Sequence, residues 1–385
     1  MPDPVVISAF ARTPTGSFLG RLSGVKATDL GSIAVRAAVA RAGVDPALVE
    51  QIIMGCVLPA GLGQAPARQA GLGAGLPHAV AATTVNKMCG SGLQAVIMAA
   101  DAIAAGSAEI IVAGGMESMS NAPYLLAKYR AGARIGHDKI SDSMYLDGLE
   151  DAYEPGKLMG AFAEDTARHY QFTRAAQDAF ALESLARALA AQASGAFAAE
   201  IVAVNEISRD EAPERADPSR IPTLKPAFAP EGTITAANAS SISDGAAALL
   251  ITRASTARDR HLPIAARIVA HAVHAQEPRL FTTAPVPAIR RVLAKAGWSV
   301  ADVDLFEVNE AFAAVAMIAL QDLAIPHERL NVNGGACALG HPIGASGARI
   351  LVTLLAALQA RGLRRGVASL CIGGGEAVAL AVERD

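Results

Sequence analysis

Short apolar runs rich in Val and Ile alternate along the chain with stretches in which apolar residues recur every three or four positions. Residues 5–10, 51–57 and 110–113 are runs of the first kind, which are typical of buried strands. Residues 30–42 have the spacing of an amphipathic helix, and a second helical pattern begins near Ser91. This alternation predicts an α/β fold in which helices cover sheets.

The last third of the chain repeats the order of elements found in the first third. The stretch AVARAGVDPALVEQIIMG resembles VLAKAGWSVADVDLFEVN, and aligning Gly43 with Gly297 gives an offset of 297 − 43 = 254 residues. A second pair of similar stretches aligns Ser91 with Ser346, an offset of 346 − 91 = 255 residues. Two matches at almost the same offset predict a duplicated α/β unit.

The middle of the chain has no counterpart in this repeat. Residues 117–240 contain two helical patterns, near 161–170 and 174–194, and a proline-rich tract, DEAPERADPSRIPTLKP. Ligands of α/β sheets bind beyond the carboxyl ends of strands, so an insertion after the strand that ends at Gly114 and Gly115 would cover such a site. An oligomerisation surface is the alternative. The predicted divisions are residues 1–116 with 241–264, residues 117–240, and residues 265–385.

Composition narrows the class of protein. The chain has 385 residues, of which 52% are hydrophobic and 4% aromatic, and its formal net charge is −3. It is long enough to bury a large core, while its charge and few aromatic residues argue against a nucleic-acid or membrane partner. No basic segment followed by an apolar one opens the chain, and no uncharged apolar run reaches the roughly 18 residues of a membrane span. We therefore expect a cytoplasmic protein.

One cysteine stands out from the others by its surroundings. The four cysteines are Cys56, Cys89, Cys337 and Cys371. They form no CxxC pair or cluster, so we expect neither a disulfide framework nor a metal site. Cys89 lies in NKMCGSGLQA, at a glycine-rich turn before a helical pattern, where backbone N–H groups and the helix dipole favour a thiolate. The alternative is a buried, inert thiol.

Three further polar residues occupy positions suited to chemistry. His341 lies in GHPIGASGAR, a loop rich in Gly and Ser, and is a candidate general base; the alternative is a residue that caps the next helix. Cys371 follows a strand predicted at 366–370, and a thiol pKa near 8.5 suits proton transfer, although a lone cysteine there is also typical of structure. Asn309 follows a strand predicted at 302–308, where an N-cap is the alternative.

Together these stretches resemble the thiolase family. NKMCGSGLQA, NEAFAA, GHPIGASGAR and CIGGG match four family motifs in order and spacing, and the similarity extends over the whole chain, including GGMESMSNAPY and TAANASSISDGAAA. The resemblance implies a duplicated five-layer α/β/α/β/α core with an inserted covering loop domain. It also implies a homo-oligomer, a dimer or tetramer, with a place in fatty acid metabolism.

The activity implied by the resemblance is a reversible, ping-pong acyl transfer. Two acetyl-CoA would give acetoacetyl-CoA and CoA, or a 3-oxoacyl-CoA and CoA would give acyl-CoA and acetyl-CoA. The CoA thioesters are substrates, and no cofactor is implied. The sequence leaves the physiological direction open.

The resemblance also assigns roles to residues. Cys89 would carry the acyl group, and His341 would take its proton and later activate the incoming thiol. Cys371 would move the α-proton of acetyl-CoA, and Asn309 would hold a water that, with His341, stabilises the enolate. The backbone N–H groups of Cys89 and Gly373 would form an oxyanion hole, whose donors are typically worth about 10²–10³ in rate each.

The resemblance also implies that five residues contact CoA. They are Ser240, Leu149, Met159, Ala311 and Phe312. The chain departs from the pattern of short-chain thiolases at Leu158, where a histidine is usual, and at Phe281-Thr282, where Met-Gly is usual. These departures leave the acyl chain length open, and either Arg215 or Arg220 could meet the CoA 3′-phosphate.

Three other functions compete with this interpretation. A 3-oxoacyl synthase has a similar duplicated fold but uses two histidines, and it gives Cys371 no role. A nicotinamide-dependent oxidoreductase is suggested by GLGQAPARQAGLGAG, but this stretch lacks the strand and the G-x-G-x-x-G turn of a dinucleotide site. A non-catalytic acyl-CoA-binding protein would not need both thiols.

Overall fold

A computed structural model describes residues 3–385. Its strands are β1 (Val5–Arg12), β2 (Gly16–Ser17), β3 (Gln51–Gly55), β4 (Ala81–Val85), β5 (Ile110–Ser118), β6 (Tyr124–Leu125), β7 (Ser141–Asp142), β8 (Ser243–Arg253), β9 (Ala266–Ala275), β10 (Leu305–Val308), β11 (Arg365–Ile372) and β12 (Glu376–Glu383). Its α-helices are α1 (Ala27–Ala42), α2 (Pro66–Gly73), α3 (Ser91–Ala104), α4 (Met159–His169), α5 (Arg174–Ser194), α6 (Glu211–Arg215), α7 (Ala254–Asp259), α8 (Pro285–Ala296), α9 (Ala313–Leu323), α10 (Ala336–Leu339) and α11 (Ile343–Arg361). These elements alternate along the chain as the hydrophobic pattern predicts.

Ten strands of the core form one continuous hydrogen-bonded sheet, whose halves β1-β8-β5-β3-β4 (the first sheet) and β9-β12-β11-β10 (the second sheet) have matching strand order. The main hydrogen-bonded path runs β10-β11-β12-β9-β1-β8-β5-β3-β4. Its two halves join only where β1 meets β9, through two residue pairs, Val6 with Arg267 and Ile7 with Ala266. The two halves have the same strand order, because β3, β5, β8 and β1 correspond to β10, β11, β12 and β9. Beyond β10, a single parallel bridge between Leu330 and Phe306 takes the place of β4. The duplication predicted from the sequence is therefore confirmed.

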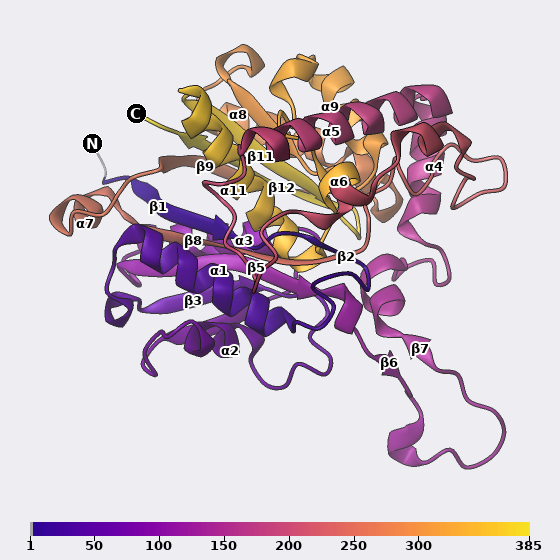
Figure 1. The fold of residues 1–385 in the computed structure, drawn as a ribbon, viewed down its shortest axis with the longest axis horizontal. Coiled ribbons are helices and arrows are strands. Elements are labelled where there is room, and N and C mark those ends of the chain that lie inside the picture. The colour runs from indigo at the N-terminus through magenta and orange to yellow at the C-terminus, as the bar shows by residue number, and fades with distance from the viewer. Residues whose placement is uncertain (1–2) are drawn as a thin grey trace.

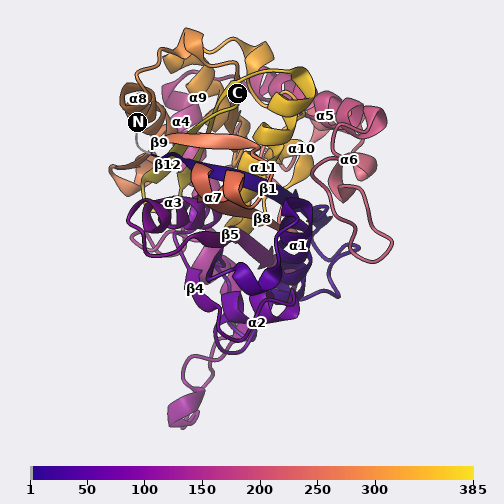
Figure 2. The same cartoon turned by 90° about the vertical axis from the view of Figure 1, so that its left-hand side faces the viewer.

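The helices fill three layers around these two sheets, as Figures 1 and 2 show. The core on one side lies between the first sheet and helices α1 and α2, and the core on the other side lies between the second sheet and helices α8 and α9. Between the sheets, α3 and α11 pack side by side and share one buried cluster with strands of both halves. This gives the five layers α/β/α/β/α expected from the resemblance.

Matching helix ends show the repeat at single residues. Gly43 ends α1 and Gly297 ends α8, with φ angles of 66° and 70°. This left-handed conformation is the usual helix C-cap and favours glycine, which has no Cβ to clash with the backbone. The pair of glycines that aligns the two halves of the sequence therefore performs the same task in each half.

Two predicted strand limits are wrong. Strand β5 does not end at Gly114 and Gly115 but continues through Ser118, because it pairs with β8 over its full length. Strand β10 begins at Leu305 rather than at 302, because Ser299 and Asp302 form a reciprocal capping box that starts a turn of 3₁₀ helix. The other predicted elements agree with the structure to within a few residues.

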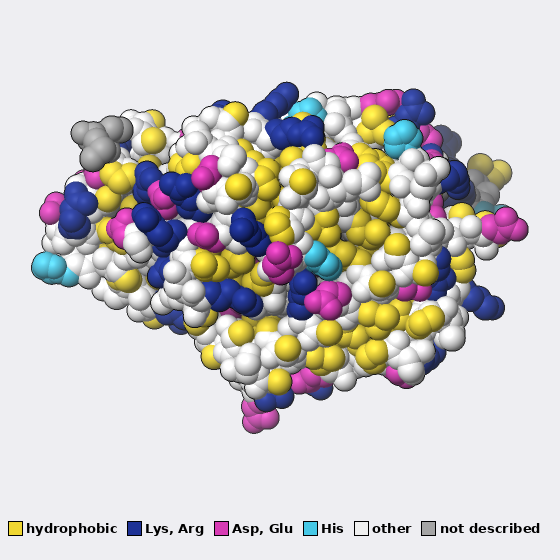
Figure 3. All heavy atoms as spheres, turned by 90° about the horizontal axis from the view of Figure 1, so that it is seen from above, with side chains coloured by type: hydrophobic (Ala, Val, Ile, Leu, Met, Phe, Trp, Pro, Cys, Tyr) yellow, Lys and Arg dark blue, Asp and Glu magenta, His cyan; other side chains and the backbone are white. Residues whose placement is uncertain are grey.

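Residues between β5 and β8 form the covering layer. Helix α5 crosses the face of the molecule above the second sheet, while β6 and β7 form a two-stranded hairpin that projects from the body of the molecule (Figure 1). On the face seen in Figure 3, Lys and Arg side chains are interspersed with Asp and Glu side chains, as expected from the small net charge. The division of the chain into three domains stays a prediction.

Helix α11 is the one helix among residues 3–385 that is long and apolar enough to cross a membrane. Its mean hydropathy is 1.5 over 18 residues, but 89% of that window is buried inside the structure. It packs against α3 between the two sheets and carries the buried Arg349. Its apolar character is thus explained by its position in the central layer.

Candidate active site

Close contact between the two halves creates the site. A Cβ on Gly92 of α3 would lie 2.7 Å from the Ala348 backbone nitrogen, and one on Gly347 of α11 would lie 2.4 Å from that of Leu93. Only glycine leaves room for such an approach, so the repeated Gly-Ser motifs let the first turns of both central helices touch. The loops that precede the two helices, which carry Cys89 and His341, are thereby brought to the same end of the molecule.

Cys89 lies one residue before the N-cap of α3, with its own backbone N–H and that of Gly373 acting on its thiol. Both N–H groups lower the pKa of the thiol, but burial has the larger effect and raises it to about 11. The preference for a thiolate expected at the helix N-terminus is therefore outweighed by burial. Because the thiol is protonated near neutral pH, its attack on a substrate requires a base.

Cys371 lies near the end of β11, close enough to Cys89 for the two sulfur atoms to affect each other. Burial and the charge of Cys89 both raise the pKa of Cys371 well above its ordinary value. The next residue, Ile372, packs on the turn that carries Cys89, since a Cβ on Gly90 would lie 2.4 Å from its Cδ1 atom. Two thiols 282 positions apart in the chain (371 − 89) thus lie close together.

His341 is 8% exposed and sits in the loop before α11. Its backbone N–H donates to the carbonyl oxygen of Ser241 at 3.0 Å, and its Nδ1 lies 2.5 Å from the Oγ atom of Ser346. Burial, helped by the charge of Arg349, lowers the pKa of the imidazole to about 3. The ring is therefore neutral near pH 7, and its Nε2 atom has no hydrogen-bond partner among the described residues.

Asn309 is 1% exposed, and neither its Oδ1 nor its Nδ2 has a hydrogen-bond partner within residues 3–385. An N-cap role is excluded, because α9 begins at Ala313 after the extended Phe312. A buried amide left unpaired costs about 1–3 kcal/mol per group, so such residues usually serve a ligand or a water. Asn309 and His341 are therefore the residues of the predicted site whose fully buried side-chain atoms lack a hydrogen-bond partner within residues 3–385.

The five predicted CoA contacts lie around these groups. The Ser240 backbone N–H donates to the Ala311 carbonyl oxygen at 3.0 Å, and Phe312 forms a bridge with the residue before Ser240. Met159 begins α4, and its sulfur lies 3.4 Å from the position of a Cβ on Gly373. Leu149 packs against the same apolar cluster as Cys89. The structure thus places all ten predicted site residues in one region.

Two supporting residues have no role in the sequence analysis. Glu117 is fully buried and accepts backbone N–H groups from Val57, Leu58 and Gly344 at 2.9, 3.1 and 2.9 Å, so it ties the first half to the start of α11. Burial is the main cause that raises its pKa to about 7. Ser346 fixes the His341 ring. Glu117 could have been found from the sequence as a single acidic residue at the end of an apolar strand. Nothing in the local sequence indicated a role for Ser346.

A network of buried charges lies behind His341. Arg12 pairs with Glu200 and Asp210, which come from the covering layer, at 2.7 Å each. Arg349 is 3% exposed and lies 3.9 Å from Glu307, whose pKa is raised to about 8 mainly by burial. Breaking such a pair leaves an uncompensated buried charge, so the network holds the covering layer against the core.

Other features of the described chain bear on what the site can hold. All four cysteines are free thiols. Within residues 3–385 no group of three or more His, Cys, Asp or Glu side chains could hold a metal ion. The two departures from short-chain thiolases lie close to the site, because Leu158 directly precedes α4 and the Phe281 ring packs edge-on against Phe312 with centroids 6.3 Å apart.

Comparison with known proteins accounts for this arrangement. The thiolase N-terminal domain model matches residues 5–255, and the thiolase C-terminal domain model matches residues 262–384. The chain belongs to the thiolase family. It is therefore an enzyme, an acyltransferase.

Several curated thiolases resemble it along their whole length. The acetyl-CoA acetyltransferase of Escherichia coli (strain K12) is 51% identical over 394 residues, covering 100% of each chain. That of Cupriavidus necator is 50% identical with the same coverage. Acetyl-CoA acetyltransferase 2 of Arabidopsis thaliana is 50% identical over 99% of this chain and 97% of its own.

Proposed function

We propose that this thiolase interconverts two acetyl-CoA with acetoacetyl-CoA and CoA. The observation that carries the proposal is the convergence of two thiols, a neutral imidazole and an unpaired amide in one buried site. The relatives that match over their full lengths are acetyl-CoA acetyltransferases, which supports the same substrates here. Neither the 3-oxoacyl synthase nor the non-catalytic binding protein uses this set of groups.

In the cleaving direction, His341 Nε2 takes the thiol proton as Cys89 Sγ attacks the 3-oxo carbon. The bond between C2 and C3 breaks, its electron pair goes to C2, and the Cys371 thiol protonates C2 to release acetyl-CoA. The proton on His341 restores Cys371, and the acyl group remains on Cys89. The thiol of CoA then gives its proton to the base, attacks this thioester, and releases acyl-CoA and the Cys89 thiol.

Negative charge develops on oxygen at two points of this cycle. The N–H groups of Cys89 and Gly373, which already act on the Cys89 sulfur, suit the tetrahedral intermediate formed there. Asn309, through a water, and His341 suit the enolate oxygen, because both have unused hydrogen-bonding atoms. These groups supply the acid, the base and the oxyanion donors, so we propose that CoA thioesters react here without a metal or cofactor.

We propose a preference for short acyl chains, although a somewhat longer 3-oxoacyl-CoA remains a candidate substrate. Three phenylalanines belong to the same hydrophobic cluster as Cys371. Phe312 packs edge-on against Phe228 at 6.0 Å and against Phe281 at 6.3 Å between ring centroids. Because these packed rings are rigid, they leave little room for a long acyl chain of the substrate.

A cleft beside the site contains both arginines that could meet the nucleotide end of CoA. Arg215 and Arg220 both line a cleft of about 320 Å³ together with Ser241 and Cys337. Ser241 accepts the backbone N–H of His341, so the cleft leads from the surface toward the catalytic groups. We propose that the two arginines share the 3′-phosphate, since both present donors to it.

The direct test is thiolysis. Purified protein mixed with acetoacetyl-CoA and free CoA should deplete the 3-oxoacyl thioester, followed by its absorbance, and rates with C4 to C16 substrates should fall with chain length. Dialysis against EDTA should leave the rate unchanged. Failure to turn over any chain length contradicts the proposed function, and a maximum at long chains contradicts the substrate preference.

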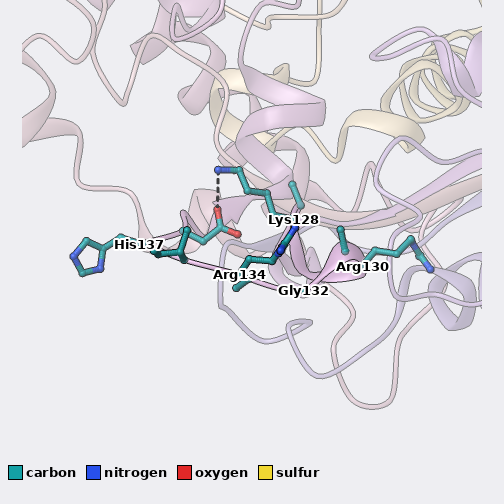
Figure 4. Close-up of a pocket in the computed structure, with 11 residues that line it drawn as sticks. Lys128, Arg130, Gly132, Arg134 and His137 are labelled. Atoms are coloured by element: carbon teal, nitrogen blue, oxygen red, sulfur yellow. Dashed lines mark ion pairs between the residues drawn. The ribbon is translucent and has the colours of Figure 1, made fainter.

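We propose further that the protein is a homotetramer in the cytoplasm with a role in fatty acid metabolism. The projecting hairpin β6–β7 supports a second copy as partner, since it carries hydrophobic side chains that this chain leaves uncovered: Tyr124, Leu126, Tyr129, Ile135 and Ile140. Ile135 is 98% exposed. At the tip, Arg130 and His137 extend away from each other into the surroundings (Figure 4). Strand β4 adds an open sheet edge with partly exposed residues.

Light scattering tests this assembly. The wild-type protein should elute with the mass of four chains, and the double variant Ile135→Asp/Ile140→Asp should have a smaller mass, because the charges disrupt an apolar contact. A substitution of the exposed Ile264, which lies far from the hairpin in the sequence, serves as the control. A monomeric wild-type protein contradicts the proposal.

A further inference from the structure

The loop that carries the nucleophile and the hairpin that follows Cys371 touch at three points. Ile372 packs on Gly90, and the Gly373 backbone N–H acts on the Cys89 thiol. The third contact is an ion pair between Lys87 Nζ and Glu376 Oε2. All three join the N-terminal half to the C-terminal half beside the reacting atoms. The ion pair is the outermost, with side chains 22% and 35% exposed.

The hairpin is held by its own half as far as Ile372 on one strand and Gly375 on the other, whose carbonyl oxygen accepts the Gln276 N–H at 2.9 Å. Strand pairing between β11 and β12 ends at Ile372 with Glu376, and the turn between them includes Gly374 and Gly375 with φ angles of 95° and 87°. Gly373 lies inside this turn, outside the ladder. The direction of its N–H group therefore depends on where the tip of the hairpin is fixed.

The nucleophile loop is built differently. Met88 has a φ angle of 46°, a conformation that costs a residue with a side chain about 1–3 kcal/mol. Two local hydrogen bonds hold it, from the Met88 N–H to Asn86 Oδ1 at 3.0 Å and from the Lys87 N–H to Ser91 Oγ at 2.8 Å. The backbone of Lys87 is thus anchored to α3, and its side chain offers a fixed point beside the hairpin tip that contains Gly373.

We propose that Lys87 and Glu376 act as a clamp that holds the Gly373 N–H against the Cys89 sulfur. This inference rests on the proposed function, in which that N–H is an oxyanion donor. A partly exposed ion pair adds at most about 1 kcal/mol to stability. Its contribution to rate is larger if it sets the geometry of an oxyanion donor, because the loss of one such donor costs about 10²–10³. Lys87 and Glu376 are positioning residues, since neither touches the reacting atoms.

The test is a double-mutant cycle with a charge swap. Lys87→Met and Glu376→Gln should each lower kcat for thiolysis about tenfold, a fraction of the loss of a full donor. KM for CoA should stay within about threefold of wild type, because the clamp does not bind CoA. The double variant should be no worse than either single one. The swap Lys87→Glu/Glu376→Lys should restore most of kcat.

Two controls separate the explanations. Arg260→Met removes an exposed ion pair with Glu109, which precedes the first residue of β5 and so lies at the opposite end of that strand from Glu117, and should leave kcat unchanged. Raising the salt concentration should weaken the wild-type clamp and leave Lys87→Met unaffected. Additive losses, an unrestored swap, or a rise in KM for CoA in Lys87→Met alone each overturn the clamp; the last outcome would make Lys87 a CoA ligand.

A readout independent of turnover distinguishes failure of the clamp from failure of the proposed function. Cys89 alkylation by iodoacetamide should be slower in both single variants, since the Gly373 N–H that stabilises the thiolate is displaced. If wild-type protein shows no thiolysis, the proposed function fails, and the clamp is still decided by alkylation. Equal alkylation rates in wild type and both variants contradict it.

Discussion

His341 Nδ1 lies 2.5 Å from Ser346 Oγ, and that hydroxyl lies 2.9 Å from the carbonyl oxygen of Pro342. A serine hydroxyl has one proton, and the Pro342 carbonyl can only accept. Ser346 therefore donates to Pro342 and accepts from the Nδ1–H group of His341. This fixes the tautomer of the neutral ring and leaves the Nε2 lone pair free to act as a base.

Replacing Ser346 should thus impair catalysis more than folding. We expect Ser346→Ala to lower kcat about 10- to 100-fold, in the range found for residues that orient a functional histidine. KM should change little, because the hydroxyl does not contact substrate. Thiolysis kinetics and the melting temperature check this prediction. Ser346→Thr, which keeps the hydroxyl, is the matched variant and should retain more activity than Ser346→Ala. Equal kcat in wild type and Ser346→Ala would contradict it.

Substitution of each reactive thiol should block a different, separately measurable step of the reaction. Cys89→Ala should abolish acylation by acetyl-CoA, whereas Cys371→Ala should still acylate but exchange the α-protons of acetyl-CoA slowly. The reason is that one sulfur forms the covalent bond and the other transfers a proton. Mass spectrometry of the intact protein measures the first step, and deuterium exchange measures the second. Acyl-enzyme formed in Cys89→Ala would mean that the roles are wrongly assigned.

The pKa of Cys89 predicts how its reactivity depends on pH. Because burial raises this pKa to about 11, the thiol is protonated at pH 7, and alkylation should keep accelerating as the pH rises to 10. Iodoacetamide labelling, with Cys89→Ala as the blank, gives this profile. A plateau below pH 8 would indicate a resting thiolate and contradict the burial argument.

Glu117 should make the folded protein less stable as the pH rises, the opposite of the usual effect of a carboxyl group. Its folded pKa of about 7 lies above the ordinary value of 4.5, so the folded state binds an extra proton between these values. Stability from this group is complete below about pH 4.5 and is lost as the pH rises through 7, a change of about 3 kcal/mol.

Denaturant unfolding at pH 5 and pH 8 tests this effect of Glu117. The wild-type protein should lose more stability between the two pH values than Glu117→Gln, which cannot ionise at this position. The difference between the two proteins isolates Glu117 from the other groups that titrate in this range. A difference near zero would show that Glu117 is ionised in the folded protein at pH 5.

Much of the fold followed from local pattern. The alternation of apolar runs gave the elements, and Gly43 and Gly297 revealed the duplication because each ends a helix in its own half. The ends of strands did not follow from local pattern. The end of β5 depends on pairing with β8, which lies more than 120 residues later in the chain, and no local pattern contains that partner.

The chemistry of the site divides in the same way. The amino-acid sequence by itself determined which groups are present, since motifs around Cys89, His341 and Cys371 are local and each side chain has fixed intrinsic chemistry. Only the tertiary structure decided their protonation, because burial depends on what packs around a group. Burial made the Cys89 thiol a weak acid and the His341 ring a neutral base, although the helix N-terminus by itself favours the thiolate of Cys89.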